Sequence, residues 1–317
     1  MRDRQAPGEY RLTRTEDTLY FAWANGPQAI KPRVFASEET LWRCTRSDGG
    51  QLTFEPAATS EEKLAIIGAR ACDLAALFIQ DKHFLQDTYK DTYYASRRHN
   101  LAIIAVNCTH PAPTCFCHAT GDGPRAEYGF DLALTELEEG FLLEAHSEFG
   151  LTLIDKLHVE QAGDALQARA AHKLSAAAQS QTRRLPAGNL YPTFMERLEH
   201  PRWQEVAERC LSCGNCTLVC PTCFCHREED RPALNGTHSE HVRLWDSCFT
   251  PGHSYIHGFT VRAGTDLRYR QWLVHKLGSW HEQYGRSGCV GCGRCITWCP
   301  VGIDLTEEVA AICGTPV

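Results

Sequence analysis

Cysteine is the residue type that sets this chain apart, because 17 of its 317 residues are cysteines. Eight of them form two runs of identical spacing. In each run, three cysteines are separated by two residues each, a fourth follows after three more, and a proline comes next. Thiolate sulfur is a preferred ligand of soft and borderline metals such as iron in clusters and zinc. The runs, which indicate metal binding, are Cys210, Cys213, Cys216 and Cys220, and Cys289, Cys292, Cys295 and Cys299.

The spacing C-x2-C-x2-C-x3-C-P is that of the ligand runs of bacterial two-cluster ferredoxins. Three closely spaced thiolates hold one cubane, and the fourth reaches the other cluster. The sequence therefore predicts two [4Fe–4S] clusters. Glycines between the ligands, Gly214, Gly291 and Gly293, are expected where the backbone crowds a cluster. The expected ligand sets are Cys210, Cys213, Cys216 and Cys299 for cluster one, and Cys289, Cys292, Cys295 and Cys220 for cluster two.

Zinc is the alternative metal for such thiols. Structural zinc sites use two pairs of ligands around one tetrahedral ion, whereas this chain carries two identical four-cysteine runs that both end in proline. The pattern therefore favours iron–sulfur clusters. The 69 positions from Cys220 to Cys289 exceed the compact spacing of a minimal ferredoxin, so we expect an insertion between the runs.

A six-residue repeat provides a second cysteine motif, since 113–118 and 221–226 both spell PTCFCH. The first copy lies in a loop that follows an expected strand, and Cys72 ends the neighbouring expected strand. Two interpretations remain open: an additional cluster, or thiols that only pack, because free cysteine is among the most buried residue types. The ligands of this third cluster would be Cys72, Cys108, Cys115 and Cys117.

The other cysteines are harder to assign. Cys223, Cys225 and Cys248 raise the same question with one ligand fewer, so whether they bind metal stays open. Cys44 and Cys313 are expected to be plain core or surface thiols.

The elements that position these motifs divide at about residue 190, after the turn-prone stretch 186–189. We expect an α/β domain over 1–190 and a mainly α-helical, ferredoxin-like two-cluster domain over 191–317. In the second domain, helical spacing at 201–209 and at 268–280 leads into the two cysteine runs.

Within the first domain, the apolar runs 64–69 and 101–106 predict two buried parallel strands joined by a helix over 74–85, with Asp73 as its cap. The loop that follows, 107–126, lies where α/β folds usually keep their chemistry. Two further expectations are a hairpin at 130–137 and 141–145, and a helix within 159–185.

Composition excludes several classes of protein. The net charge is −7, which argues against a nucleic-acid partner. Mean hydropathy is −0.35, and the longest apolar runs fall well short of the ~18 residues of a membrane span. The N-terminal segment lacks the apolar stretch of a secretory signal, so we expect a cytoplasmic protein. None of the familiar nucleotide or nucleophile motifs is present, so no catalytic site is expected.

Several further segments accompany the cysteine runs: IGARACDL at 67–74, VNCTHPAPTCFC at 106–117, GFDLALTE at 129–136, LSCGNC at 211–216, WDSC at 245–248, VHK at 274–276 and GCVGCGRCITWCPVGID at 288–304. In this order, with the repeated CFC, they resemble the beta subunits of cytoplasmic nickel–iron sulfhydrogenases and the related dicluster subunits of anaerobic sulfite reductases. The likeness covers most of the chain after residue 30.

The resemblance implies an iron–sulfur electron-transfer subunit with no substrate site of its own. In such hydrogenases the beta subunit joins an FAD- and NAD(P)-binding flavoprotein subunit to the hydrogenase small and large subunits. Two alternatives are an electron-transfer subunit of an anaerobic sulfite reductase and a cysteine-based redox or metal sensor. The stretches 109–113 and 117–120 depart from the family by their histidine content, which leaves the surroundings of a third cluster open.

Overall fold

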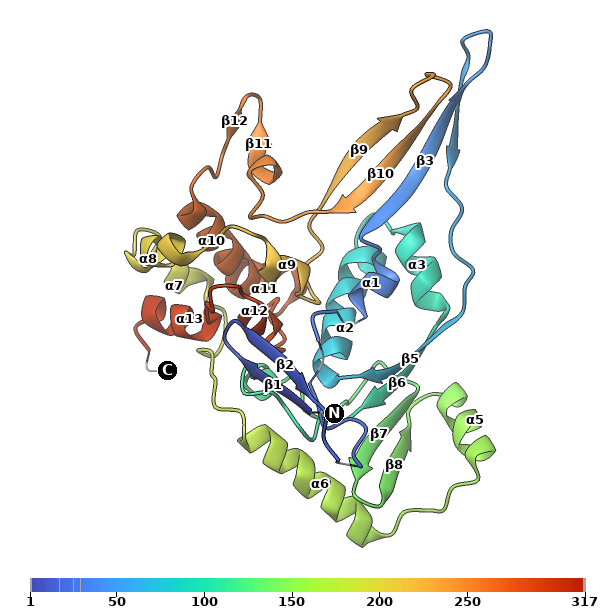
Figure 1. Ribbon diagram of the computed structural model, residues 1–317, viewed down its shortest axis with the longest axis vertical. Helices are drawn as coiled ribbons and strands as arrows, with labels where there is room; N and C mark the ends of the chain where they lie inside the picture. The colour runs from blue at the N-terminus through green and yellow to red at the C-terminus, as the bar shows by residue number, and fades with distance from the viewer. Residues whose placement is uncertain (1, 17, 25, 29, 316–317) are drawn as a thin grey trace.

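A four-stranded sheet forms the centre of the N-terminal half of the computed structural model, which describes residues 2–16, 18–24, 26–28 and 30–315 (Figure 1). Its order is β5-β6-β7-β8. β5 and β6 are parallel, and β7 and β8 form an antiparallel hairpin. The predicted parallel pair and hairpin are therefore confirmed. The strands are Leu64–Ala69 (β5), Leu101–Val106 (β6), Leu132–Leu137 (β7) and Gly140–Ala145 (β8).

Helix α2 follows β5 directly and spans Ala71–Gln86. The expectation that Asp73 caps this helix is wrong. The N-cap is Arg70, and Asp73 lies in the first turn, where its carboxylate accepts a hydrogen bond from Arg70 N at 3.1 Å. A first-turn carboxylate that reaches back to the N-cap N–H is half of a capping box. The earlier start places Cys72 inside the first turn of α2.

The remaining helices of this half surround the sheet. Asp91 caps α3 by accepting from Tyr94 N at 2.8 Å, and α6 falls inside the predicted segment 159–185. The bounds are Lys31–Val34 (α1), Thr92–His99 (α3), Cys117–Thr120 (α4), Glu148–Leu157 (α5) and Asp164–Gln179 (α6).

A second four-stranded sheet joins the two halves of the chain, in the order β4-β3-β10-β9. β3 pairs antiparallel with β10, which lies in the insertion between the two cysteine runs. In Figure 1 these strands form an arm that extends away from the helices. The strands are Glu38–Arg46 (β3), Leu52–Pro56 (β4), His226–Pro232 (β9) and His238–Trp245 (β10).

The region after residue 190 contains strands as well as helices, so the prediction that it is mainly helical is not confirmed. What holds is a mixed α and β chain. The division at residue 190 stays a prediction. The helices are Tyr191–Met195 (α7), Arg202–Arg209 (α8), Asn215–Leu218 (α9), Thr265–Val274 (α10), Trp280–Tyr284 (α11), Arg294–Thr297 (α12) and Leu305–Cys313 (α13), and the short strands are Tyr255–Ile256 (β11) and Phe259–Thr260 (β12).

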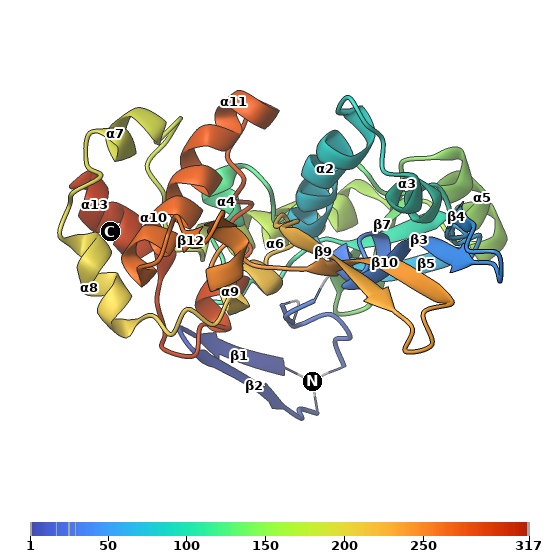
Figure 2. The same ribbon diagram turned by 90° about the horizontal axis from the view of Figure 1, so that it is seen from above.

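Helix α2 is also the place where the two halves meet. Ala75, Ala76 and Ile79 of α2 pack against Trp280 of α11 and against Val290 of the second cysteine run. Figure 2 shows α2 between α11 and the strands. The N-terminal hairpin, Arg2–Ala6 (β1) and Glu9–Thr13 (β2), reaches the same region, because Gly8 N donates to Ile296 O at 3.1 Å. Among the described residues, no helix combines the length and apolar character that a membrane span requires.

A buried ion-pair network ties the arm to α3. Arg243 of β10 pairs across the strands with Glu39 of β3, with Nη2 2.6 Å from Oε2. Arg243 also pairs with Asp91 at the start of α3, and Glu39 also pairs with Arg97 of α3. Glu39 is only 5% exposed. Removal of Arg243 would therefore leave a buried carboxylate short of its counter-charges.

We predict that Arg243→Ala lowers the free energy of unfolding by about 3–5 kcal/mol, the usual loss when one partner of a buried pair is removed. The measurement is urea denaturation of the anaerobically purified protein. Arg43→Ala on the same sheet is the control, since Arg43 pairs with Glu240 at 2.9 Å where both side chains are exposed. This control should cost less than about 1 kcal/mol. Equal losses in the two variants would contradict a structural role for the network.

Candidate metal centre

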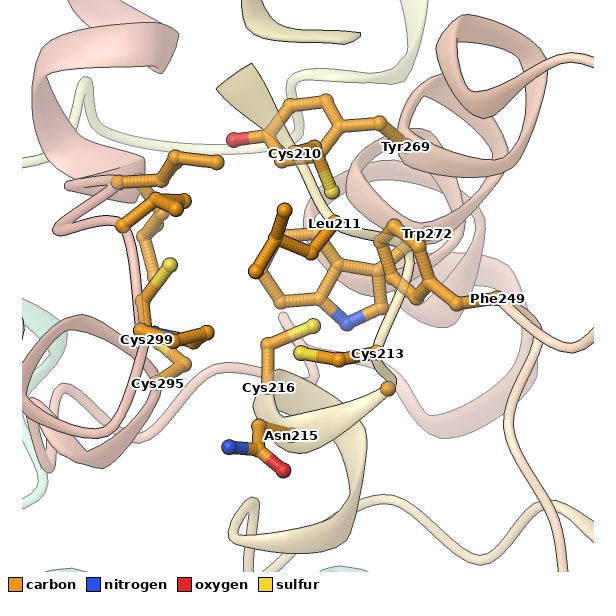
Figure 3. Close-up of a pocket in the computed structure, with 15 residues that line it drawn as sticks. Cys210, Leu211, Cys213, Asn215, Cys216, Phe249, Tyr269, Trp272, Cys295 and Cys299 are labelled. Atoms are coloured by element: carbon orange, nitrogen blue, oxygen red, sulfur yellow. The ribbon is translucent and has the colours of Figure 1, made fainter.

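The first site, defined as Cys210, Cys213, Cys216 and Cys299, lines a single cavity (Figure 3). Cys210 caps the end of α8, and α9 begins immediately after Gly214 and carries Cys216. Cys299 comes from the second run, so the structure brings together the four cysteines predicted for cluster one. The other described residues of the cavity wall carry no charged side chain, and Phe249, Tyr269 and Trp272 make much of it apolar.

Both runs fold into the same local structure. Ser212 N donates to Cys210 Sγ at 3.4 Å, and Gly291 N donates to Cys289 Sγ at the same distance. A glycine with a φ of about +70° then starts a single helical turn in each run, which only glycine does without strain. These glycines are Gly214 before α9 and Gly293 before α12, with φ of 74° and 70°.

The second site, defined as Cys220, Cys289, Cys292 and Cys295, lies beside the first. Burial raises the pKa of the Cys295 thiol well above its usual value, and the neighbouring Cys289, Cys292 and Cys220 raise it further. The structure thus gathers the four cysteines predicted for cluster two. Cys220 and Cys289 are buried, whereas Cys213 of the first site is exposed. The second site is the more desolvated of the two.

A buried lysine from the VHK segment contacts the second site, a role that its sequence position did not predict. Lys276 Nζ donates to Cys220 Sγ at 3.5 Å and to Thr222 Oγ1 at 2.9 Å. Burial alone lowers the pKa of this ammonium, but the neighbouring Cys220, Cys223 and Cys289 outweigh burial and hold the pKa well above its usual value.

The third site, defined as Cys72, Cys108, Cys115 and Cys117, lines a second cavity. Cys72 lies at the start of α2, directly after β5, Cys108 follows β6, and Cys117 starts α4. These predicted cysteines therefore converge at the ends of neighbouring parallel strands, as expected for an α/β fold. Cys292 of the second site lines the same cavity.

Sequence reasoning missed three polar residues at the third site. Arg70 and Arg294 line its cavity, and Arg294 forms a buried ion pair with Asp73 at 2.7 Å. Gln181 Nε2 lies 3.5 Å from Cys117 Sγ. Arg70 lies two positions before Cys72, and Arg294 lies between two run cysteines, which was an available signal. Gln181 is far from any cysteine in sequence and offered none.

The repeated PTCFCH segments dock on the second cysteine run. In the first copy, Phe116 N donates to Gly291 O at 2.8 Å. In the second copy, Thr222 Oγ1 donates to Gly288 O at 2.7 Å. Thr114, which is equivalent to Thr222, shares a 2.8 Å hydrogen bond with Thr297. Both copies therefore hold the loop that carries Cys289 and Cys292.

The glycines of the second run are required by this docking. A Cβ at Gly291 would lie 2.5 Å from Cys117 N, and a Cβ at Gly293 would lie 2.4 Å from Thr114 O. These glycines were expected to lie where the backbone crowds a cluster. Gly291 N does donate to a ligand sulfur, but its Cα faces the backbone of the first repeat. Backbone packed on backbone leaves no room for a side chain at these two positions.

The three unassigned cysteines form a separate group. Cys225 lies beside Cys248 and His253, and the hydrogen bond from Cys248 is the main cause that lowers the pKa of Cys225 to about 4. His253 Nδ1 in turn pairs with Asp246 Oδ2 at 3.1 Å. Cys223 is buried next to Cys220. In the part of the chain that the structure describes, no three His, Cys, Asp or Glu side chains are placed to hold a single metal ion.

The donor sets fit [4Fe–4S] clusters. At the first and third sites four thiols line a cavity instead of converging on one point, which suits a multi-iron cubane with one thiolate per iron. Backbone N–H groups donate to Cys210 and Cys289 sulfurs, the type of interaction that tunes cluster potentials.

Comparisons with known proteins agree with this chemistry. The family described as "4Fe-4S dicluster domain" matches residues 209–303, which include all eight cysteines of the two runs. The chain is 30% identical over 252 residues to sulfhydrogenase 2 subunit beta of Pyrococcus furiosus, a match that covers 76% of this chain and 72% of that protein. No solved structure matches the chain.

We predict that Gly291→Ala displaces the first PTCFCH segment and lowers both the melting temperature and the iron content of anaerobically purified protein. The added Cβ meets fixed backbone, so the loops must separate. Gly129→Ala is the matched control, because Gly129 has a similar φ of +78° but open space around its Cβ position. It should lose only the ~1–2 kcal/mol of left-handed strain and keep its iron. Similar behaviour of the two variants would argue against the backbone contact.

Proposed function

Because this chain belongs to the family of sulfhydrogenase beta subunits, we propose that it is an iron–sulfur electron-transfer subunit of a hydrogenase complex. It would relay electrons from an NAD(P)H-linked flavoprotein subunit to a hydrogenase module of small and large subunits, or in the reverse direction, in the cytoplasm. When bound, each [4Fe–4S] cluster accepts and releases one electron at a time. The chain's own residues hold the clusters at fixed separations and exclude water from them.

The observation that carries this proposal is that the three cysteine sites adjoin one another in series. Cys295 belongs to the second site and also lines the cavity of the first. Cys292 belongs to the second site and also lines the cavity of the third. The second site is thus the neighbour of both others. A series of adjacent one-electron centres is the arrangement that a relay needs.

The first site supplies an outlet for such a relay. Cys213 is exposed, Leu211 beside it is 64% exposed, and Val301 beyond Cys299 is 37% exposed. An apolar surface around an exposed ligand suits the docking of a partner protein, because burial of that surface excludes water between donor and acceptor.

The two alternatives make different predictions. An electron-transfer subunit of a sulfite reductase would use the same series of sites, and only the proteins that copurify with it differ. A cysteine-based sensor needs no series of adjacent sites, and it would show cluster loss coupled to partner binding. The adjacency of the three sites favours a relay.

We predict that the purified chain neither oxidises hydrogen nor reduces NAD(P), and that NAD(P)H reduces its clusters only when the flavoprotein subunit is added. The measurement is anaerobic visible absorbance and electron paramagnetic resonance. Cys299→Ser should slow transfer to the hydrogenase module, because it removes a ligand of the first site. Cys313→Ser on α13 is the control and should transfer normally. Hydrogen oxidation by the isolated chain, or copurification with a sulfite reductase, would refute this assignment.

We further propose a third [4Fe–4S] cluster on Cys72, Cys108, Cys115 and Cys117. Three clusters carry about twelve irons and two carry about eight, with equal acid-labile sulfide. We expect about twelve in the reconstituted wild type, about eight in Cys115→Ala, and no change in Cys44→Ala, whose thiol lies on β3. An iron content near eight that is unaffected by Cys115→Ala would leave the third-site cysteines as packing residues.

A further inference from the structure

Lys276 occupies a segment of unusual backbone geometry. Residues His275–Ser279 form a π-helical turn between α10 and α11. Such turns accommodate an extra residue in a helix and occur frequently at functional sites. Here the turn directs Lys276 into the interior, where it is 4% exposed. Its own carbonyl accepts a 2.7 Å hydrogen bond from Gly288 N, which fixes the turn against the start of the second cysteine run.

The partners of this buried ammonium are the second site and its supports. Nζ donates to Cys220 Sγ and to Thr222 Oγ1, and it lies 3.5 Å from Gly288 O. None of these partners is a carboxylate. Other buried cations of the chain have one: Arg294 pairs with Asp73 and Arg243 pairs with Glu39.

A buried charge requires a counter-charge, because transfer of an isolated ion out of water costs several kcal/mol. Cys220 and Cys289 are the anionic groups available to Lys276, and both are predicted ligands of the second cluster. A cubane held by four thiolates is itself an anion, and its negative charge grows when it accepts an electron. In a desolvated site that added charge is unfavourable, and the net charge around a cluster is one of the factors that set its potential.

We propose that Lys276 is a positioning residue that raises the reduction potential of the second cluster and keeps the middle of the relay reducible. The inference rests on the proposed electron-transfer function. In the step concerned, a neighbouring cluster loses one electron and the second cluster gains it, while Lys276 keeps its proton and its ammonium offsets the added charge. The effect is confined to the second site, because no charged side chain lines the described wall of the first.

Another lysine approaches this region but makes different contacts. Lys31 Nζ donates to Leu218 O at 2.9 Å and lies 4.0 Å from the ring centroid of Trp245. Carbonyl oxygens and an aromatic face stabilise that ammonium. Lys276 is therefore the lysine whose ammonium donates directly to a predicted cluster ligand.

The test compares wild type with Lys276→Gln and Lys276→Arg in the reconstituted full-length chain. Glutamine keeps a hydrogen-bond donor without the charge, and arginine keeps the charge. Each protein is titrated potentiometrically and followed by electron paramagnetic resonance. The second cluster is identified by the signal lost in Cys289→Ser, and the first by the signal lost in Cys213→Ser. Lys82→Gln is the control, since Lys82 Nζ donates to Tyr284 O at 3.0 Å and to no cysteine.

At the wild-type midpoint of the second cluster, Lys276→Gln should lower the ratio of reduced to oxidised cluster at least about tenfold, a shift of ~59 mV for one electron. Lys276→Arg and Lys82→Gln should stay within about threefold of wild type, and the first cluster should not shift. Loss of the second cluster in the glutamine variant alone would also support a need for the charge.

Two results would overturn the inference: an unchanged potential in Lys276→Gln, or loss of the second cluster in both variants, which would indicate a structural role. A wild-type chain that binds no iron would overturn the proposed function as well. A cluster whose potential ignores Lys276 would overturn this inference alone.

Discussion

Close backbone contact between the first PTCFCH segment and the second cysteine run is the constraint on which the metal centre depends. The contact exists only because Gly291 and Gly293 lack side chains, so that the backbone of Thr114 and Cys117 lies against them. It joins a loop of the α/β sheet to the dicluster half of the chain. Through it, Cys292 faces the third site while its own run forms the second.

Burial and charge then distinguish the three sites. The first has an apolar wall and an exposed cysteine, the second contacts Lys276, and the third has Arg70 and Arg294 in its wall. Arg294 is paired with Asp73, so its charge is largely balanced within the protein. The same thiolate chemistry is thus placed in three electrostatic environments, and local charge is the means by which a protein gives identical clusters different affinities for an electron.

Patterns that depend on neighbouring residues were predictable from the sequence. The spacing of the runs identified both crossed ligand sets, and the apolar runs that became β5 and β6 identified a parallel pair. Features that depend on distant partners were not predictable. The pairing of β3 with β10 brings together segments about 200 residues apart, and local pattern carries no record of such a register. The π-helical turn at Lys276 and the contact of Gln181 with Cys117 likewise depend on tertiary packing.

The crossing of the ligand sets has a consequence for biosynthesis. Cys299 completes the first site and Cys220 completes the second, so neither set exists until the ribosome has passed the end of the second run. The third set is translated much earlier, but its cavity wall includes Cys292 and Arg294. A nascent chain therefore exposes its early thiols to oxidation and to competing metals throughout elongation. Cofactor insertion is a late event that requires a released, folded chain, and the cell must keep the thiols reduced until then.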